Sequence, residues 1–169
     1  NVLKKIGLQK GARVADLGTG SNATWAIASA RIVGDTGIVY AVDILKPVLE
    51  AVHTKASLEG LHNIKTVWSD LEIYGATKVP EATLDMVYLI NTLYKTSQPG
   101  KVLAEGVRLL KSGGRMVIID WKAAPQGFGP DEAHKMHVEE IERECLGLGL
   151  KPIQVFSPGD YHFGLLFQK

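Results

Sequence analysis

The chain has 169 residues, of which 46% are hydrophobic and 22% charged, and its formal net charge is +1. This length suits a single domain, residues 1–169, with a substantial core, and no apolar run approaches the roughly 20 residues that span a bilayer. A charge this close to zero argues against nucleic acid or an acidic membrane as an obligate partner. Cys145 is the one cysteine, so we expect neither a disulfide within the chain nor a metal site built on cysteine pairs. The first ten residues are polar and mixed, unlike a secretory leader, and we expect a cytoplasmic protein.

Apolar, β-branched runs alternate with segments of helical periodicity along the chain. The predicted strands are Arg13–Leu17, Ile38–Asp43, Ile64–Trp68, Leu84–Ile90, Arg115–Asp120, Lys151–Phe156 and Tyr161–Gln168. The predicted helices are Asn1–Leu8, Thr24–Val33, Pro47–Leu58, a helix from Pro99 that ends at Gly113-Gly114, and a helix from Pro130 or Asp131 to Leu148. Prolines at helix starts and glycines at helix ends support these boundaries.

Strand and helix alternate five times, which predicts parallel strands joined by right-handed crossovers. The last two predicted strands are separated only by Ser157–Asp160, which is too short for a parallel crossover. We therefore expect the final strand to run antiparallel to its neighbours. The predicted fold class is α/β, a Rossmann-like doubly wound sheet of seven strands that is mostly parallel, with strand 7 antiparallel and helices on both faces.

A glycine loop, Gly18-Thr19-Gly20, joins the first predicted strand to a helix. Glycine lets a ligand approach the backbone, and the free N–H groups that open a helix point toward it, as in nucleotide-cofactor sites. Three interpretations are open: a tight turn without a ligand, a dinucleotide site, and a site for S-adenosylmethionine (SAM). The spacing from Gly18 to Ala23, with Asp43 downstream, also satisfies the dinucleotide pattern.

Asp16 favours SAM over a dinucleotide. A carboxylate two residues before the first glycine would repel a pyrophosphate, whereas it can receive the cationic amino-acid end of SAM, directly or through water. The expected antiparallel final strand points the same way.

Five segments, in order, resemble the motifs of class I SAM-dependent methyltransferases. They are Val14–Gly20, Val39–Asp43, Val67–Asp70, Leu84–Asn91 and Leu110–Ile118. The last third of the chain looks most like the small-molecule methyltransferases grouped with quinone-biosynthesis enzymes. The resemblance covers nearly the whole length and implies SAM as the cofactor, with S-adenosylhomocysteine as its product.

The resemblance also implies roles for residues at the matching positions. Asp43 would hold the ribose hydroxyls, Asp70 would accept the adenine amino group and Leu71 would pack on the ring. The other expected cofactor-binding residues are Asp16, Gly18, Thr19, Gly20, Asn22, Ile44 and Asn91. Asn22 replaces the third glycine of the usual first motif; it tolerates left-handed backbone, but its side chain puts the cofactor affinity in question.

Asp120 and Tyr94 are the candidate catalytic residues, because they follow the fifth and fourth predicted strands, at the edge where open α/β sheets bind ligands. Asp120 is the best-placed candidate base. His134 and His137 lie three residues apart on a predicted helix, and we interpret them as a solvated face rather than a metal site.

We therefore predict an enzyme that transfers a methyl group from SAM to an acceptor, most simply a small molecule, by in-line displacement. Two alternatives are a protein or RNA methyltransferase and a SAM-binding module without catalysis. The stretch Asn91–Tyr94 lacks the paired prolines usual in enzymes that methylate nucleic-acid amino groups, which argues against such targets. The cover over the strand ends is expected to be thin, and the acceptor and oligomeric state stay open.

Overall fold

The computed structural model describes residues 2–122, 129–134 and 136–169. Within them the strands are β1 (Arg13–Leu17), β2 (Ile38–Asp43), β3 (Ile64–Trp68), β4 (Leu84–Ile90), β5 (Leu110–Trp121), β6 (Lys151–Gly159) and β7 (His162–Gln168). They form one sheet in the order β3-β2-β1-β4-β5-β7-β6. The pairings from β3 to β5 are parallel, whereas β7 is antiparallel to both β5 and β6. The predicted fold class, including the antiparallel strand 7, is confirmed.

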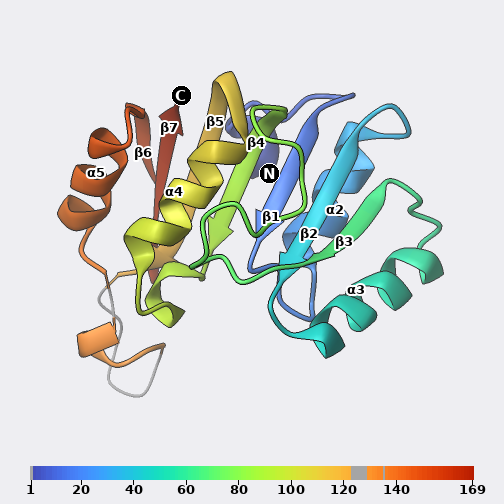
Figure 1. The fold of residues 1–169 in the computed structure, drawn as a ribbon, viewed down its shortest axis with the longest axis horizontal. Helices are drawn as coiled ribbons and strands as arrows, with labels where there is room; N and C mark the ends of the chain where they lie inside the picture. Colours follow the sequence, from blue (N-terminus) through green and yellow to red (C-terminus); the bar gives the residue numbers. More distant parts are fainter. Residues whose placement is uncertain (1, 123–128, 135) are drawn as a thin grey trace.

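Helices cover both faces of this sheet (Figure 1). They are α1 (Val2–Lys5), α2 (Thr24–Val33), α3 (Lys46–Leu58), α4 (Pro99–Leu109) and α5 (Val138–Gly147), with 3-10 turns η1 (Leu93–Lys95) and η2 (Glu132–His134). One buried cluster joins apolar residues of α1, α2 and α3 to the sheet, and the other joins those of α4 and α5 to the opposite face. Cys145 of α5 is fully buried in the second cluster, as expected for a core residue. None of the described helices is long and apolar enough to cross a membrane.

The structure corrects several predicted boundaries. Helix α1 ends at Lys5 rather than at Leu8, and β5 begins at Leu110 rather than at Arg115. Helix α4 ends at Leu109 rather than at the glycine pair, because Leu110 is already extended and pairs with Leu84 of β4. Helix α5 begins at Val138 and not at Pro130, since His137 is extended and the residues that bury the helix, such as Ile141, lie only beyond it. Strand β6 continues to Gly159 through an irregular register with β7, so the predicted turn is shorter.

The connections fix where a ligand can bind. From β1 the chain crosses to β2 and β3 on one side, and it then returns to β4 on the other side of β1. In open α/β sheets, the crevice at the carboxyl ends of the strands at such a switch point is the usual ligand site. The segments that follow β1, β2, β3 and β4 all lie at this edge.

Gly37 lies in the turn between α2 and β2, where α2 packs closely against the segment before β1. A Cβ at this position would lie 2.5 Å from Val33 Cβ and 2.7 Å from the Ala12 carbonyl oxygen. We expect Gly37→Ala to lower the free energy of unfolding by about 1–3 kcal/mol, measured by chemical denaturation. Gly147→Ala is the control: it meets no atom within 4 Å at the end of α5, and it should be neutral or stabilising by up to about 1 kcal/mol. Equal effects in the two variants would contradict the packing described here.

Candidate functional site

A pocket of about 570 Å³ opens at the carboxyl ends of β1, β2, β3 and β4. Its walls come from the glycine loop, from the segments that follow β2, β3 and β4, and from the first turn of α4. The lining residues are Gly18, Gly20, Ser21, Asp43, Ile44, Leu45, Val48, Ser69, Asp70, Leu71, Glu72, Thr92, Lys95, Thr96 and Val102. Six predicted cofactor-binding residues are among them: Gly18, Gly20, Asp43, Ile44, Asp70 and Leu71.

The glycine loop is held from both sides. The Gly18 and Thr19 N–H groups donate to the Val42 carbonyl of β2, at 2.8 and 3.0 Å. Gly18 has a φ of +79°, and a Cβ there would lie 2.7 Å from the Thr92 hydroxyl, which donates to the Leu17 carbonyl at 3.0 Å. Gly20 has a φ of +66° and nothing within 4 Å of its absent Cβ. The loop therefore needs glycine for conformation at both positions and for close packing at Gly18.

Asp43 is fixed where β2 ends. One carboxylate oxygen accepts the Gly20 N–H at 3.2 Å, and the other accepts the Leu45 N–H at 3.1 Å. These bonds tie the glycine loop to the next strand and aim a half-buried carboxylate at the pocket. Each carboxylate oxygen has a further lone pair, so both can still accept a hydrogen bond from a ligand.

Asp70 follows β3 and lines the same pocket. Its Oδ1 accepts the Glu72 N–H at 2.9 Å, which closes a turn and orients the carboxylate. Leu71, Ile44 and Val102 supply apolar wall beside it. Asp43 and Asp70 therefore line one cavity together with these apolar residues.

Asp16 lies behind the loop rather than on the pocket wall. It is 2% exposed, and its carboxylate accepts the Thr19 hydroxyl at 2.9 Å and the Ala26 N–H. Burial raises the pKa of Asp16 to about 6; the Thr19 and Ala26 hydrogen bonds oppose this rise, and the nearby charge of Asp43 adds to it. A buried carboxylate that titrates near neutrality is suited to a cationic partner.

Asn22 lies away from the pocket. It is exposed, and its backbone carbonyl accepts a hydrogen bond from the Lys55 ammonium of α3 at 2.7 Å. The left-handed non-glycine residue of this turn is Ala23, with a φ of 48°, and not Asn22. The substituted third glycine therefore does not crowd the cavity.

The segment after β4 places the remaining candidates beside the pocket. Asn91 has a φ of 52°, in the left-handed region that asparagine tolerates better than most residues, and its buried Oδ1 has no hydrogen-bond partner among the described residues. Tyr94 is half-buried in η1. Neither residue is part of the pocket wall, but Thr92, Lys95 and Thr96 of the same segment are.

Asp120, the candidate base, is 2% exposed at the end of β5. Its carboxylate accepts N–H groups from Leu93 at 3.1 Å, Tyr94 at 3.4 Å and Trp121 at 2.8 Å. Burial raises the pKa of Asp120 despite these hydrogen bonds. The geometry is that of a carboxylate that holds the start of η1 in place.

Sequence reasoning did not single out Glu72, Lys95 and Thr96 as pocket residues. The Glu72 carboxylate accepts the Thr96 hydroxyl and the Ser97 N–H, the latter at 3.0 Å, so it joins the segment after β3 to the start of α4. The hydrogen bond from Thr96 is the main reason that the pKa of Glu72 is lowered. All three residues follow strands at the ligand edge, and this position in the sequence could have marked them as pocket residues.

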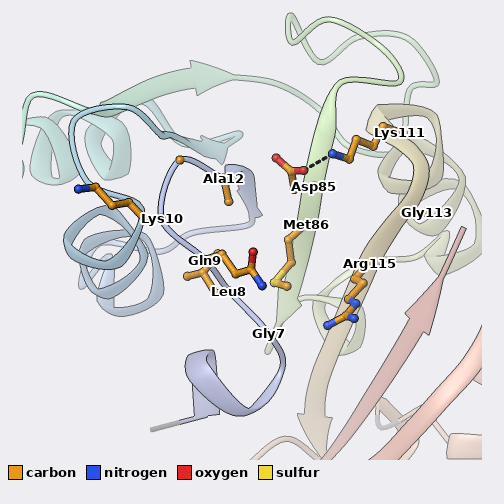
Figure 2. A pocket seen from close by; sticks show the side chains of 11 residues that line it. Gly7, Leu8, Gln9, Lys10, Ala12, Asp85, Met86, Lys111, Gly113 and Arg115 are labelled. Carbon is orange, nitrogen blue, oxygen red and sulfur yellow. Dashed lines mark ion pairs between the residues drawn. The ribbon is translucent and has the colours of Figure 1, made fainter.

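A second cavity, of about 580 Å³, lies at the opposite end of the sheet (Figure 2). It contains none of the predicted site residues. Asp85 lies in it, paired with Lys111 and accepting the Arg13 N–H at 2.8 Å, so its carboxylate joins the start of β4 to β1 and β5. Because Asp85 is engaged with Lys111 and Arg13, and no predicted site residue lies in this cavity, the ligand-edge pocket is the better candidate.

Comparison with known proteins identifies the family. Residues 15–118, from β1 to β5, match the family described as "Methyltransferase domain". The chain belongs to this methyltransferase family. The match covers Asp43, Asp70 and the glycine loop, so the resemblance expected from the motifs is confirmed.

Several methyltransferases are similar to this one. A demethylmenaquinone methyltransferase of Geobacillus stearothermophilus is 30% identical over 129 residues, which cover 76% of this chain and 53% of that protein. A ubiquinone/menaquinone biosynthesis C-methyltransferase of Erwinia tasmaniensis is 30% identical over 137 residues, which cover 78% and 52%. A SAM-dependent methyltransferase from Aquifex aeolicus superposes with a TM-score of 0.89 at 29% identity, covering 99% of this chain and 87% of that one. The chain spans about half the length of the curated relatives it matches.

Proposed function

We propose that this methyltransferase binds SAM in the ligand-edge pocket and transfers its methyl group to a small-molecule acceptor. The observation that carries the proposal is the pair of half-buried carboxylates, Asp43 and Asp70, that face one cavity beside the glycine loop. The family and the fold imply SAM as the methyl donor. The residues present fit that molecule part by part.

The adenosine part would lie between the two acids. Asp43 would accept both ribose hydroxyls through the lone pairs that Gly20 and Leu45 leave free. Asp70 would accept the adenine amino group, and Leu71 and Ile44 would cover the ring. Apolar walls suit an uncharged adenine ring. They do not suit a charged pyrophosphate.

The methionine part would reach the buried polar groups behind the loop. Its ammonium would favour the ionised form of Asp16 and offset the burial of that charge. The unpartnered Oδ1 of Asn91 is a buried acceptor that needs a donor, and the same end of the ligand carries one. An unpaired buried acceptor next to a ligand pocket is otherwise a cost to stability.

When bound, SAM supplies a methyl group that is already electrophilic on a sulfonium. The residues of the chain then have to position the acceptor in line with that methyl and exclude water. The hydrogen bonds that Asp120 accepts from η1 commit its carboxylate to holding Leu93 and Tyr94, so we propose it as a positioning residue. Tyr94 is our candidate for contact with the acceptor. A base is needed only where the acceptor must lose a proton.

The acceptor class rests on the relatives, whose names refer to demethylmenaquinone and ubiquinone/menaquinone biosynthesis. We propose a quinol-type small molecule. The alternative of a non-catalytic SAM-binding module is tested by the turnover assay below; Asn22, which put the cofactor affinity in question, is exposed and is not among the residues that line the pocket.

A turnover assay tests this proposal. The protein is incubated with SAM and a panel that contains a soluble naphthohydroquinone, a peptide mixture and an RNA oligomer, and S-adenosylhomocysteine is measured. We expect saturable product formation with the hydroquinone, none with peptide or RNA, and none with Asp43→Ala, while Asp35→Ala, an exposed acid outside the pocket, keeps the wild-type rate. Product formed only with peptide or RNA, or SAM binding with no product on the whole panel, would contradict the proposal.

A further inference from the structure

Glu105 is a charged residue on the buried face of α4. It is 0% exposed, and its helical neighbours Val102 and Leu109 are core residues. A carboxylate at such a position is costly unless its lone pairs are all used. The reason for its presence must therefore lie in the groups that it holds.

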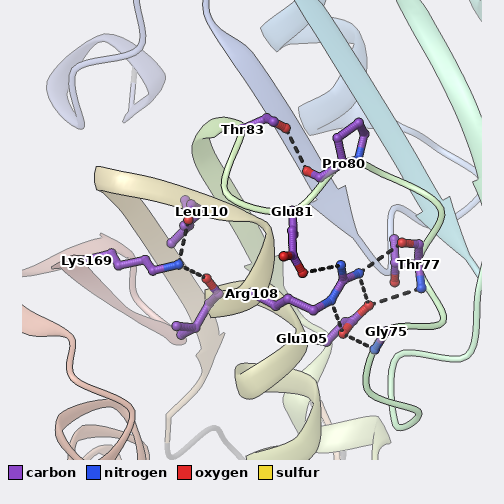
Figure 3. Close-up of polar contacts among 10 residues, drawn as sticks. Gly75, Thr77, Pro80, Glu81, Thr83, Glu105, Arg108, Leu110 and Lys169 are labelled. Carbon is purple, nitrogen blue, oxygen red and sulfur yellow. Dashed lines mark hydrogen bonds and ion pairs between the residues drawn. The ribbon is translucent and has the colours of Figure 1, made fainter.

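Four donors surround this carboxylate (Figure 3). The Arg108 guanidinium binds it in a bidentate manner, with Nε at 2.9 Å and Nη2 at 2.7 Å. The Gly75 N–H donates to Oε2 at 2.8 Å, and the Thr77 N–H donates to Oε1 at 3.1 Å. Burial opposes ionisation, but these hydrogen bonds outweigh it and lower the pKa of Glu105 to about 2. Glu105 is therefore a permanent anion that is fully satisfied.

Gly75 and Thr77 belong to the long segment between β3 and β4, which contains no helix or strand. Such a segment lacks the regular hydrogen-bond ladder of a helix or strand, so individual contacts hold it in place. Arg108 adds a second hold, because its Nη2 donates to the Thr77 carbonyl at 3.0 Å. The backbone around Thr77 is thus clamped on both its N–H and its C=O by α4.

The contacts of Glu105 and Arg108 with Thr77 extend to the pocket through one further hydrogen bond. The Thr77 and Ser69 hydroxyls lie 2.9 Å apart, and both are buried. Ser69 lines the pocket immediately before Asp70 and Leu71. Glu105 itself does not line the pocket, yet a continuous chain of contacts runs from it to the residues on the adenine side.

We propose that Glu105 is a positioning residue for recognition of the adenine ring, acting through Thr77 and Ser69 on Asp70. This inference rests on the proposed function. Without Glu105, the turn that carries Asp70 keeps its local hydrogen bonds, the bond from the Ser69 N–H to the Asp43 carbonyl, and the contacts of Glu72 with Thr96 and Ser97, but it loses the support that reaches Ser69 through Thr77. Loss of Glu105 should therefore weaken the contact with the adenine amino group selectively and spare the contacts made elsewhere in the pocket.

The test compares two ligands, S-adenosylhomocysteine and its analogue with purine in place of adenine, which lacks the amino group. In the wild-type protein we expect the first to bind about tenfold more tightly, as one hydrogen bond to a carboxylate provides. In Glu105→Gln we expect that preference to fall to about twofold or less, with the affinity for the purine analogue nearly unchanged. Calorimetric titration measures both.

Asp85→Asn is the matched control, since it breaks an ion pair with Lys111 at the far end of the sheet. It should lower Tm without changing the preference between the two ligands, which separates positioning from general loss of stability. Thr77→Val is the second variant, should Glu105→Gln not fold: it leaves the carboxylate–Arg108 pair intact and removes the hydroxyl link to Ser69, and it should also reduce the preference. A preference that is unchanged in both folded variants would overturn the role of Glu105, whereas a wild-type protein that binds neither ligand would overturn the proposed function itself.

Discussion

Asp43→Ala is expected to weaken binding of SAM and S-adenosylhomocysteine by about 100-fold or more. Hydrogen bonds to a charged group contribute about 1.5–3 kcal/mol each, and the carboxylate would make two to the ribose. The substitution also releases the Gly20 N–H and the Leu45 N–H, which Asp43 holds at 3.2 and 3.1 Å. The geometry of the glycine loop and the ribose contacts are therefore lost together. Calorimetric titration gives the two dissociation constants.

Asp35→Ala is the control for this result. Asp35 is an exposed acid in the turn between α2 and β2, so its removal changes the net charge equally without touching the ligand-edge pocket. Affinity in the Asp35 variant should match the wild type within twofold. Near-normal affinity in the Asp43 variant would refute the ribose assignment.

The second large effect concerns Asp16 and pH. Burial raises the pKa of Asp16 to about 6, so the folded protein binds this proton more tightly than the unfolded chain does. The contribution of Asp16 to stability is thus fully present below pH 4 and is lost as the pH rises through 6. The loss is about 3 kcal/mol, at 1.36 kcal/mol for each pKa unit. In Asp16→Asn this pH dependence should disappear, and it should persist in Asp35→Asn. Chemical denaturation at pH 4.5 and pH 7.5 measures the difference between the variants.

The same carboxylate should couple ligand binding to pH. An ammonium group prefers the ionised form of Asp16, so the affinity of the wild-type protein for S-adenosylhomocysteine should increase between pH 5 and pH 7, and binding near pH 6 should release a proton. Asp16→Asn should bind at least tenfold more weakly at pH 7.5 and should lose this pH dependence. Titrations in buffers of different ionisation enthalpy count the protons. Affinity that is flat from pH 5 to pH 7 in the wild type would mean that Asp16 does not meet the ligand.

The sequence predicted the fold well where hydrophobic patterning is strong. The four strands from β1 to β4 have the predicted bounds, because apolar and β-branched residues dominate each and a polar or glycine residue ends or follows it. The errors fall where long-range pairing decides the backbone. Leu110 has the periodicity of α4 but is recruited by Leu84 into β5. A local pattern contains no information about such a partner.

The candidate site divides in the same way. Asp43 and Asp70 could be placed from sequence because strand ends and family motifs mark them, and both line the pocket. Asp120 was placed at the correct edge, but the three N–H groups that enclose its carboxylate come partly from η1, which no sequence pattern indicated. Glu105 was missed for a similar reason: its partners Gly75 and Thr77 lie 30 and 28 residues away in a segment without periodicity.

The measurement that tests the account most directly is calorimetric titration of the wild-type protein with SAM, S-adenosylhomocysteine and NAD. The pocket joins Asp43, Asp70 and an apolar wall to a glycine loop, and a buried Asp16 lies behind the loop. That arrangement predicts micromolar-range binding of both adenosyl compounds, each with one site, and no binding of NAD. Binding of NAD alone, or of none of the three, would contradict the assignment of this pocket to SAM.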